Sequence, residues 1–333
     1  MTETRYDVLA IGNAIVDVLS HTDDGFLGRE GLTKGTMRLI DAAEAERLYD
    51  RIGPAVEVSG GCAGNTAAGV ASFGGRAAFI GKVAEDALGR IYGHDIRAAG
   101  VAFATPPVRN GAPTARSLIL VTPDGERTMN TYLGACQALG PEDVDPESVA
   151  AARITYLEGY LWDPPEAKQA FRRAAEVARQ AGRKVALTLS DSFCVDRWRD
   201  EFRGLVEGGM VDVLFANEGE ARALYETASL DAAVAALRET CPLTVVTLGA
   251  KGSLVVTRRE THQVDAMPVD RVVDTTGAGD LFAAGFLYGL AGGRDLTDCA
   301  RLGALAAAEI ISHIGARPEA SLKSLAEQSG LLP

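Results

Sequence analysis

Short apolar runs alternate with amphipathic stretches along most of the chain. Runs typical of buried strands lie at residues 6–11, 77–83, 154–157, 184–189, 211–216, 243–248 and 253–257. Stretches with helical spacing separate most of them, at 65–73, 85–99, 166–181, 200–207, 218–225 and 230–239, with two more at 280–291 and 297–314. Strands that alternate with helices predict a mostly parallel sheet with helices on both faces. We therefore expect an α/β fold of three layers.

Two segments depart from this alternation. Residues 117–121 and 127–132 alternate in the manner of strands around Pro123-Asp124-Gly125, which is typical of a hairpin. The segment 20–38 is mostly polar. We interpret both as parts of a small β lid over the open edge of the sheet, formed by about residues 14–40 and 105–135. No linker is long enough to separate two domains, so residues 1–333 are expected to form a single domain with this lid.

The composition is that of an ordinary globular protein. Of the 333 residues, 47% are hydrophobic and 23% are charged. The formal net charge of −12 argues against a nucleic-acid polymer or an anionic membrane as a partner. The N-terminal residues lead into the first strand without the pattern of a signal peptide. The longest apolar stretches are interrupted before about 20 residues, so we expect no membrane span.

The five cysteines are scattered, and no two of them form a Cys-x-x-Cys pair. An odd number without such spacing predicts reduced thiols, with neither a disulfide framework nor a zinc site. Reduced thiols indicate a cytoplasmic protein. The cysteines are Cys62, Cys136, Cys194, Cys241 and Cys299.

Residues 274–280, Asp-Thr-Thr-Gly-Ala-Gly-Asp, carry the most chemical information in the chain. We expect Arg271-Val272-Val273 to end a strand and a helix to begin at Asp280. Gly277 and Gly279 have no Cβ, so the backbone there can turn sharply and approach a ligand. The first N–H groups of the helix would form an anion site beside the Asp280 carboxylate. This arrangement favours phosphoryl transfer, with Asp280 accepting the proton of the attacking hydroxyl.

The same string has a simpler interpretation, and it excludes two other motifs. Gly-x-Gly followed by Asp is also an ordinary capped helix after a tight turn. A dinucleotide-binding Gly-x-Gly-x-x-Gly would need glycine at position 282, where the chain has Phe282. A Walker loop would need Gly-Lys-Ser/Thr, and Lys251-Gly252-Ser253 has the wrong order.

A second polar element, Asn217-Glu218-Gly219-Glu220, follows the apolar run 211–216. In an open parallel sheet the carboxyl ends of strands are where ligands bind. Asn217 and Glu220 share one face of a helix start, and together they suit a hydrated Mg²⁺. The alternative is a capping box in which the acidic residue complements the helix dipole. The two interpretations are compatible.

Two further turns have the chemistry of an acceptor site. Ser59-Gly60-Gly61-Cys62-Ala63-Gly64-Asn65 would bring the backbone close to a substrate, with Asn65 facing its hydroxyls. Asp17 lies just beyond the first strand, in Gly12-Asn13-Ala14-Ile15-Val16-Asp17, and can accept hydrogen bonds from two vicinal sugar hydroxyls. A plain loop and a solvated turn aspartate are the simpler alternatives.

Another turn, Thr247-Leu248-Gly249-Ala250-Lys251-Gly252, ends the run 243–248 and leads into 253–257. It either lines a nucleotide pocket or is only a hairpin. His313 is one of four histidines and lies near a helix end, where a structural role is the commoner one.

Together these segments resemble the PfkB-type carbohydrate and nucleoside kinases, the ribokinase-like family. The resemblance extends from Gly12 to about Ala316, and the string at 274–280 is highly specific for that family. The Gly-Gly-x-x-x-Asn and Asn-x-x-Glu elements occur in the family's order and context. The resemblance implies a ribokinase-like three-layer fold with a small β lid, and an ATP-dependent kinase acting on an alcohol group.

The resemblance also implies a role for each candidate residue. Asp280 would be the catalytic base, and the amides of Gly277, Ala278 and Gly279 would form the anion hole. Asn217 and Glu220 would act through Mg²⁺. The residues implied at the acceptor are Asn13, Asp17, Gly60, Gly61 and Asn65. Those implied at the adenine nucleotide are Thr247, Gly249, Gly252, Thr276 and His313.

A monovalent cation such as K⁺ near Asp274 and Thr276 is also common in the family. The helix dipole would favour the charged form of Asp280 and make it a weak base. A weak base is sufficient if the transition state is loose, because the hydroxyl then loses its proton late.

The choice of acceptor rests on smaller similarities. Residues 12–17 and 156–160 look more like the adenosine-kinase branch than like ribokinase itself. We therefore expect transfer of the γ-phosphoryl group of ATP to the 5′-hydroxyl of a purine nucleoside, adenosine first. A purine needs a flat apolar slot, and the aromatic and aliphatic side chains available for one are Tyr132, Leu133, Tyr160 and Phe193.

Two other functions stay open. One is a kinase for a sugar such as ribose, fructose or a hexose phosphate, and Arg116 and Arg127 near the lid would suit the phosphate of the last. The other is a catalytically inactive nucleoside or sugar sensor, against which the intact Asp280 argues. The expected partner in every case is a small molecule, and the protein is expected to be a monomer or a homodimer.

Overall fold

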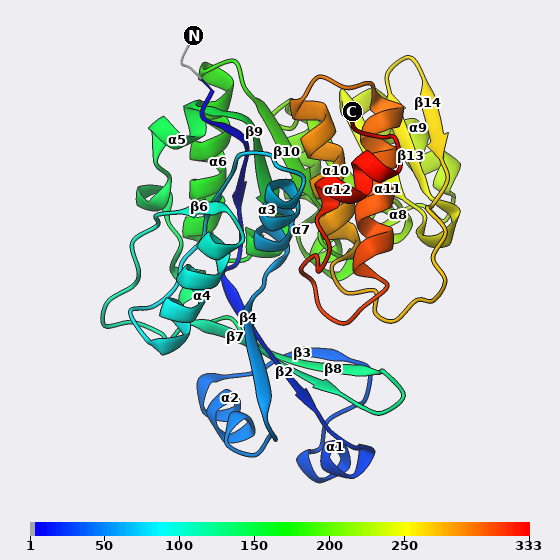
Figure 1. Cartoon of the computed structure of the whole chain (residues 1–333). Coiled ribbons are helices and arrows are strands. Elements are labelled where there is room, and N and C mark those ends of the chain that lie inside the picture. Colours follow the sequence, from blue (N-terminus) through cyan, green and yellow to red (C-terminus); the bar gives the residue numbers. More distant parts are fainter. Residues whose placement is uncertain (1–3) are drawn as a thin grey trace.

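The computed structural model describes residues 4–333 and contains two sheets (Figure 1). The large sheet has nine strands in the order β14-β13-β12-β11-β10-β9-β1-β5-β6. Its strands are β1 (Tyr6–Ile11), β5 (Ala77–Ile80), β6 (Val101–Phe103), β9 (Ala152–Glu158), β10 (Lys184–Thr188), β11 (Val213–Asn217), β12 (Leu243–Thr247), β13 (Ser253–Thr257) and β14 (Thr261–Val264). All neighbours pair in parallel except β12–β13 and β13–β14.

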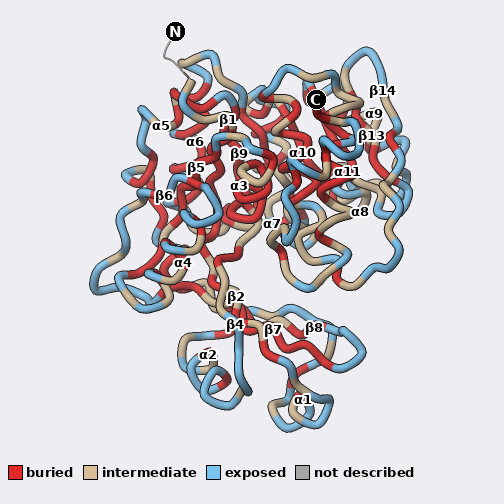
Figure 2. The backbone as a smooth tube through the Cα atoms, in the orientation of Figure 1, coloured by how far each residue is buried: buried red, intermediate tan, exposed pale blue. Residues whose placement is uncertain are grey.

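Helices cover both faces of the large sheet (Figures 1 and 2). Val8 and Ala10 of β1 belong to an apolar core with α3, α10, α11 and α12, whereas Leu9 and Ile11 belong to a second core with α6, α7, α8 and α9. The helices of the large domain are α3 (Cys62–Ser72), α4 (Ala87–Ala98), α5 (Pro146–Ala150), α6 (Pro165–Gln180), α7 (Ser192–Glu207), α8 (Glu218–Leu224), α9 (Leu230–Thr240), α10 (Ala278–Ala291), α11 (Leu296–Ile310) and α12 (Leu322–Gln328). Because successive side chains of a strand point to opposite faces, these two cores confirm the expected three layers.

Glycine sets the spacing of α10 and α11. A Cβ on Gly285 of α10 would overlap the carbonyl oxygen of Leu302, and one on Gly303 of α11 would lie 2.7 Å from the carbonyl oxygen of Phe282. The two backbones are therefore in direct contact, which fixes the position of α10 and of the residues at its N-terminus.

The small sheet projects from one end of the large domain and has the strand order β3-β8-β7-β2-β4 (Figure 1). Its strands are β2 (Ile15–His21), β3 (Met37–Leu39), β4 (Ala55–Ser59), β7 (Ala115–Val121) and β8 (Arg127–Tyr132), and two helices, α1 (Asp24–Glu30) and α2 (Ala42–Tyr49), accompany it. Leu27 of α1 and Leu48 of α2 share an apolar core with Val18 and Leu118, so the helices cover one face of this sheet. Strands β2, β3 and β4 of this sheet, and β6 and β14 of the large sheet, were not predicted as strands from the sequence. That the sheet moves as a lid stays a prediction.

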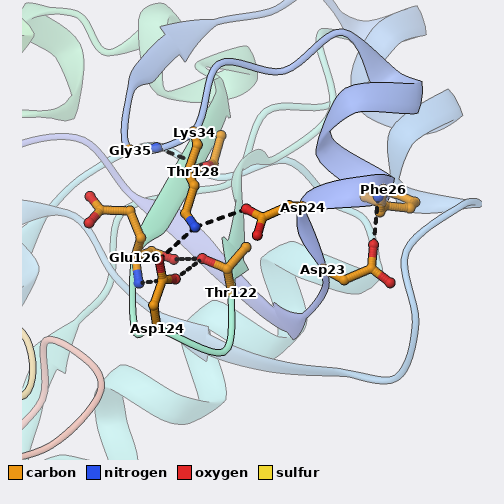
Figure 3. Close-up of polar contacts among 9 residues, drawn as sticks. All are labelled: Asp23, Asp24, Phe26, Lys34, Gly35, Thr122, Asp124, Glu126 and Thr128. Atoms are coloured by element: carbon orange, nitrogen blue, oxygen red, sulfur yellow. Dashed lines mark hydrogen bonds and ion pairs between the residues drawn. The ribbon is translucent and has the colours of Figure 1, made fainter.

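The tip of the small sheet is tied together by polar contacts (Figure 3). Lys34 Nζ lies 2.8 Å from Asp24 Oδ1 and 2.6 Å from Asp124 Oδ2, so it joins α1 to the β7–β8 turn. Thr122 Oγ1 donates a hydrogen bond of 2.6 Å to the same aspartate of the turn. Asp23 caps α1 by accepting a hydrogen bond of 2.7 Å from the N–H of Phe26.

Two sequence-based assignments are wrong in detail. Residues 271–273 form no strand, because the N–H of Val273 donates to the carbonyl of Ile311 (2.8 Å) at the end of α11 instead of to a sheet. Helix α7 begins at Ser192 and not at residue 200, since Asp191 caps it and Trp198 (φ −124°, ψ 22°) only bends it.

All five cysteines are free. Within residues 4–333, no helix is long and apolar enough to cross a membrane.

Candidate active site

Helix α10 begins at the turn that the sequence singled out. Gly277 is its N-cap with φ 79°, a left-handed conformation that favours glycine, and a Cβ there would lie 3.0 Å from Ala316 Cβ. Helical residues begin at Ala278, two positions earlier than expected. The N–H of Ala278 donates to the carbonyl of Thr275 (3.2 Å), so it closes the turn. The first turn of α10 presents its remaining N–H groups as the helix geometry requires. That these amides form an anion hole stays a prediction.

The N-termini of α3 and α10 meet at Asp280. Asn65 Nδ2 donates a hydrogen bond of 2.9 Å to Asp280 Oδ2, and Thr66 Oγ1 donates one of 3.1 Å to the Asp280 carbonyl oxygen. Asn65 Oδ1 is buried and has no partner, so an acceptor stands free beside the carboxylate. The structure therefore brings Asn65 and Asp280 together, as a shared role at an acceptor hydroxyl requires.

Burial raises the pKa of Asp280 to about 6. Hydrogen bonds from Asn65 and Cys62, and the charge of Arg317, act in the opposite direction. The expectation that the helix end makes Asp280 a weak base is therefore wrong in direction, because loss of hydration outweighs the stabilisation of the charged form. A carboxylate with a pKa near 6 is a better proton acceptor than an ordinary aspartate.

Asp17 belongs to β2 of the small sheet, and it is close enough to Asp280 of α10 to be affected by its charge. Burial raises the pKa of Asp17 to about 7, while the charges of Arg317 and Arg127 lower it and the charge of Asp280 raises it further. A Cβ on Gly60 would overlap the Asp17 carboxylate. Gly61 has φ 81°, and a Cβ there would overlap the carbonyl oxygen of Asn13. The two glycines are therefore required by the close approach of the β4–α3 turn to Asp17 and Asn13.

The side chain of Asn13 is hydrogen-bonded to Glu158, a residue that was not predicted from the sequence as part of the site. Its Nδ2 donates a hydrogen bond of 2.8 Å to Oε1 of Glu158, and the N–H of Ala63 donates one of 2.8 Å to Oε2. Glu158 is 1% exposed, and burial raises its pKa to about 7. It joins the ends of β1 and β9 to the start of α3, so it fixes these three elements relative to one another. Its place in Tyr156-Leu157-Glu158-Gly159-Tyr160, at a strand end, is the signal that could have identified it.

Two arginines were also missed as parts of this region. Arg317 Nε donates to the carbonyl oxygen of Ser59 (2.9 Å), Nη2 donates to Ser59 Oγ (3.0 Å), and Nη1 donates to the carbonyl oxygen of Gly64. Arg127 of β8 reaches the large domain, where its Nη2 lies 2.6 Å from Asp274 Oδ2. No local motif surrounds Arg317, and only the fold brings it to Ser59. Arg127 was considered only as a phosphate ligand for an alternative acceptor.

Asn217 and Glu220 form the capping box that the sequence left as an alternative. Asn217 Oδ1 accepts a hydrogen bond of 2.9 Å from the N–H of Glu220, and both Glu220 oxygens accept hydrogen bonds from Asn217. Burial raises the pKa of Glu220 to about 7. Because both Glu220 oxygens are engaged, a Mg²⁺ ion fits here only through its waters, as it commonly binds. Residues 4–333 contain no group of three acidic, histidine or cysteine side chains that could hold a metal ion. The role in Mg²⁺ binding stays a prediction.

The residues assigned to the nucleotide lie on neighbouring elements. Thr247 is paired with Asn217 across β12 and β11, so both stand at the carboxyl edge of the sheet. Gly249 (φ 61°) and Gly252 (φ 84°) shape the turn into β13, and a Cβ on Gly252 would overlap the Val264 carbonyl oxygen. The hairpin therefore explains these glycines by itself, and contact with a nucleotide stays a prediction.

His313 lies in the loop after α11, and Thr276 belongs to the turn of residues 274–280, which we call the central turn. His313 follows α11, and its Nε2 lies 3.2 Å from Oε1 of Glu309. The same loop touches the turn, since the N–H of Gly315 donates to Asp274 Oδ2 (3.1 Å). Thr276 Oγ1 accepts a hydrogen bond of 3.2 Å from Arg127 Nη1. Their assignment to the nucleotide is untested by these contacts.

The three-layer fold, and the turn at the N-terminus of α10 with the partly buried Asp280 beside it, agree with the expected class of phosphotransferase. Residues 35–322 match the family model described as pfkB family carbohydrate kinase. The chain belongs to this family, whose fold is ribokinase-like, and it is a phosphotransferase that acts on an alcohol group. Membership implies ATP and Mg²⁺ as cofactors.

Some of the relatives are named adenosine kinases, and others are named sugar kinases. The crystal structure of adenosine kinase from Sinorhizobium meliloti is 58% identical, covers 98% of this chain and 100% of its own, and has a TM-score of 0.92. A probable sugar kinase from Rhizobium etli CFN 42 is 55% identical, covers 99% and 100%, and has a TM-score of 0.93. The adenosine kinase of Saccharomyces cerevisiae is 28% identical over 331 residues, 92% of this chain and 95% of the relative. The chain is therefore a nucleoside or sugar kinase of the pfkB family.

The raised pKa values of the two aspartates predict how activity responds to pH. In the roles predicted for them, Asp280 must be ionised to accept a proton, and Asp17 accepts hydrogen bonds at both oxygens only when ionised; their pKa values are about 6 and about 7. We expect kcat/KM for the acceptor to fall as the pH decreases below about 7, with a slope that approaches two below about pH 6. A steady-state profile of kcat/KM between pH 5 and 9 measures this. In the Asp17→Asn variant, only the decrease of kcat/KM near pH 6, which belongs to Asp280, should remain. A flat profile down to pH 5 would contradict the assignment.

Proposed function

We propose that this protein transfers the γ-phosphoryl group of ATP to the 5′-hydroxyl of a purine nucleoside, with adenosine as the first choice. The observation that carries the proposal is an apolar surface on the small sheet, on the same face as Asp17. A free sugar has little apolar area with which to cover such a surface, whereas a purine ring is flat and apolar on both sides.

The register of the strands defines this surface. Residues directly opposite each other on neighbouring strands share a face of a sheet. Asp17 pairs with Ser117 and Val58, and Leu19 pairs with Ile119 and Val56. The paired positions on β7, β8 and β3 continue the face, and its apolar members include Leu19, Met37, Leu39, Val56, Val58, Ile119 and Met129. We call this set the Asp17 face.

The Asp17 face is directed at the large domain. Arg127 is two residues before Met129 on β8, so it lies on the same face, and it reaches Asp274 and Thr276. The charges of Arg317 and Asp280 act on Asp17. Three of its apolar side chains remain largely uncovered, because Met37, Leu39 and Val56 are 48%, 55% and 64% exposed. A base placed between this face and the large domain would cover apolar area that is otherwise in water.

Two of the aromatic residues suggested from the sequence fit a slot for the purine base less well than the aliphatic side chains of the Asp17 face do. Tyr132 pairs with Arg116 across β8 and β7, which places both on the opposite face of the small sheet, toward α2. Phe193 is 68% exposed at the start of α7, with the Arg197 guanidinium 4.9 Å from its ring centroid. The apolar surface near Asp17 is therefore aliphatic, and Tyr132 was the wrong choice for it.

A hexose phosphate has less support. The Arg116 guanidinium lies 5.6 Å from the Tyr49 ring centroid, on the face turned away from Asp17. Arg127 is paired with Asp274, and both side chains are less than 10% exposed. The phosphate of such an acceptor would need a cluster of basic side chains on the Asp17 face. Of these two arginines, only Arg127 lies on that face, and it is already paired with Asp274.

In the proposed reaction each side chain has one task. Asp17 accepts hydrogen bonds from two vicinal ribose hydroxyls, and Asp280 accepts the proton of the 5′-hydroxyl as the bond to phosphorus forms. Asn65 holds Oδ2 of Asp280 and offers its free Oδ1 to a hydroxyl of the acceptor. Mg²⁺ bound with ATP supplies charge neutralisation on the phosphoryl oxygens. A closed small sheet would exclude water and suppress hydrolysis of ATP.

A panel of acceptors tests the proposal. We expect kcat/KM to be about 70-fold higher for adenosine than for ribose, because burial of about 100 Å² of base area contributes about 2.5 kcal/mol. ADP release, coupled to a second enzyme, is measured with adenosine, ribose, fructose and fructose 6-phosphate. A sugar that exceeds adenosine would replace the proposed acceptor. No ADP release with any of them, together with binding of adenosine, would favour the sensor. A cytoplasmic location and a monomer or homodimer stay predictions.

A further inference from the structure

Arg127 forms a buried ion pair with the first residue of the central turn. Its Nη2 lies 2.6 Å from Asp274 Oδ2, and its Nη1 donates a hydrogen bond of 3.2 Å to Thr276 Oγ1. The side chains of Arg127 and Asp274 are 8% and 5% exposed. Arg127 belongs to β8 of the small sheet, whereas Asp274 precedes α10 of the large domain, so this pair connects the two parts of the molecule.

Asp274 organises the turn that leads into α10. Its Oδ1 accepts a hydrogen bond of 3.0 Å from the N–H of Thr276. Its Oδ2 accepts one of 3.1 Å from the N–H of Gly315, in the loop that follows α11. The turn therefore depends on a buried carboxylate, and a positive partner stabilises the ionised form of such a group.

The family resemblance places a monovalent cation at Asp274 and Thr276, and the geometry does not fit one. Both oxygens of Asp274 already accept hydrogen bonds from backbone N–H groups, and the guanidinium of Arg127 lies against Oδ2. The hydroxyl of Thr276 is also bonded to Arg127. A cation at this carboxylate would have to displace the guanidinium or lie beside a like charge.

We propose that Arg127 takes the place of the monovalent cation in this protein. The guanidinium neutralises Asp274 and orders residues 274–280, so that the phosphoryl-transfer turn forms without K⁺. The charge is supplied by the small sheet, and it is therefore present at the turn only when that sheet is in the position described here. The inference rests on the kinase activity of the chain and not on the identity of the acceptor.

The first experiment compares cations in the native protein. kcat is measured in KCl, NaCl and N-methyl-D-glucamine chloride at equal ionic strength, with saturating ATP, Mg²⁺ and acceptor. We expect the three values to agree within about twofold, because a permanently charged guanidinium already occupies the site. An activation by K⁺ of about fivefold or more over N-methyl-D-glucamine would overturn the proposal. Absence of activity with adenosine in all three salts would count against the proposed acceptor only.

The second experiment removes the guanidinium. In Arg127→Gln the Asp274 carboxylate is left buried without a cation, so we expect the thermal midpoint to fall by roughly 5 °C or more in N-methyl-D-glucamine chloride. KCl should raise this midpoint and the residual kcat of the variant by about fivefold or more, while it leaves the midpoint of the native protein unchanged. Loss of activity with no response to K⁺ in either measurement would contradict the proposal.

Three variants complete the design. Arg116→Gln is the matched control, since it changes an arginine of the same sheet on the face turned away from Asp274, and it should gain no response to K⁺. Arg127→Lys keeps a charge and should stay independent of K⁺. If Arg127→Gln fails to fold, Arg127→Gln with Asp274→Asn removes both charges, and we expect it to fold without a K⁺-dependent midpoint. A K⁺-dependent midpoint in that double variant would overturn the assignment of the site to Asp274.

Discussion

Replacement of Asp280 by asparagine is expected to lower kcat by about 10² to 10⁴, while the KM for ATP stays within a few fold. The amide cannot accept the proton of the attacking hydroxyl. It does keep the shape of the side chain, and its oxygen can still accept the hydrogen bond from Asn65 Nδ2. The change therefore removes a base without removing a contact. Steady-state rates of ADP release, with thermal midpoints as a check on folding, measure the effect.

Asp298→Asn is the matched control for this variant. Asp298 is also an aspartate in the first turn of a helix, in α11 beside α10, and it pairs with Arg301 on the surface. Its replacement should leave kcat within about twofold, as is usual for surface substitutions. Turnover of Asp280→Asn close to that of the control would remove Asp280 from the role of base.

Replacement of Asp17 by asparagine is expected to lower kcat/KM for the acceptor by about 10- to 150-fold, because hydrogen bonds to a charged group contribute about 1.5–3 kcal/mol. The loss should fall mainly on KM for the acceptor. ATP binds at the other side of the proposed site, so its KM should change little. Initial rates with each substrate varied in turn separate the two constants.

Ser117→Ala provides the comparison for Asp17→Asn. Ser117 lies directly opposite Asp17 on the same face, and its hydroxyl is paired with Thr131 Oγ1 at 2.9 Å. It should therefore change kcat/KM far less than Asp17→Asn. Equal losses in the two variants would mean that packing of the small sheet, and not the carboxylate, determines acceptor affinity.

Much of the fold follows from local sequence. The apolar runs and helical periods predict seven of the nine strands of the large sheet to within a few residues, because burial on both faces of a parallel sheet leaves a continuous apolar signal; the short edge strands β6 and β14 were missed. Strand β4 has only the short segment Ala-Val-Glu-Val-Ser and lies at an edge, so it left little pattern. Residues 271–273 are apolar but pair with the end of α11, which no local pattern indicates.

In the candidate site, too, some residues have a local sequence signal and others are identified only by the fold. Asp280, Asn65 and Asp17 follow glycine-rich turns, whose composition is visible because the backbone geometry demands it. Arg317 has no such signal, since its partner Ser59 lies 258 residues away in the chain. Glu158 required knowledge that β9 pairs with β1 beside Asn13. The direction of the pKa shift of Asp280 also required the fold, because burial and not the helix end decides it.

The glycine contacts that join α10 to α11 place Asp280, the proposed proton acceptor, on closely packed helices, whereas the Asp17 face belongs to a separate sheet. Mutations at the apolar positions of that face, away from Asp17 and Arg127, should therefore accumulate without disturbing the geometry of the reaction. New acceptor specificity in such kinases should evolve mainly through a few side chains of one sheet, and directed evolution can be restricted to the same positions. A library at Leu19, Met37, Leu39, Val56 and Met129 would cover most of that surface.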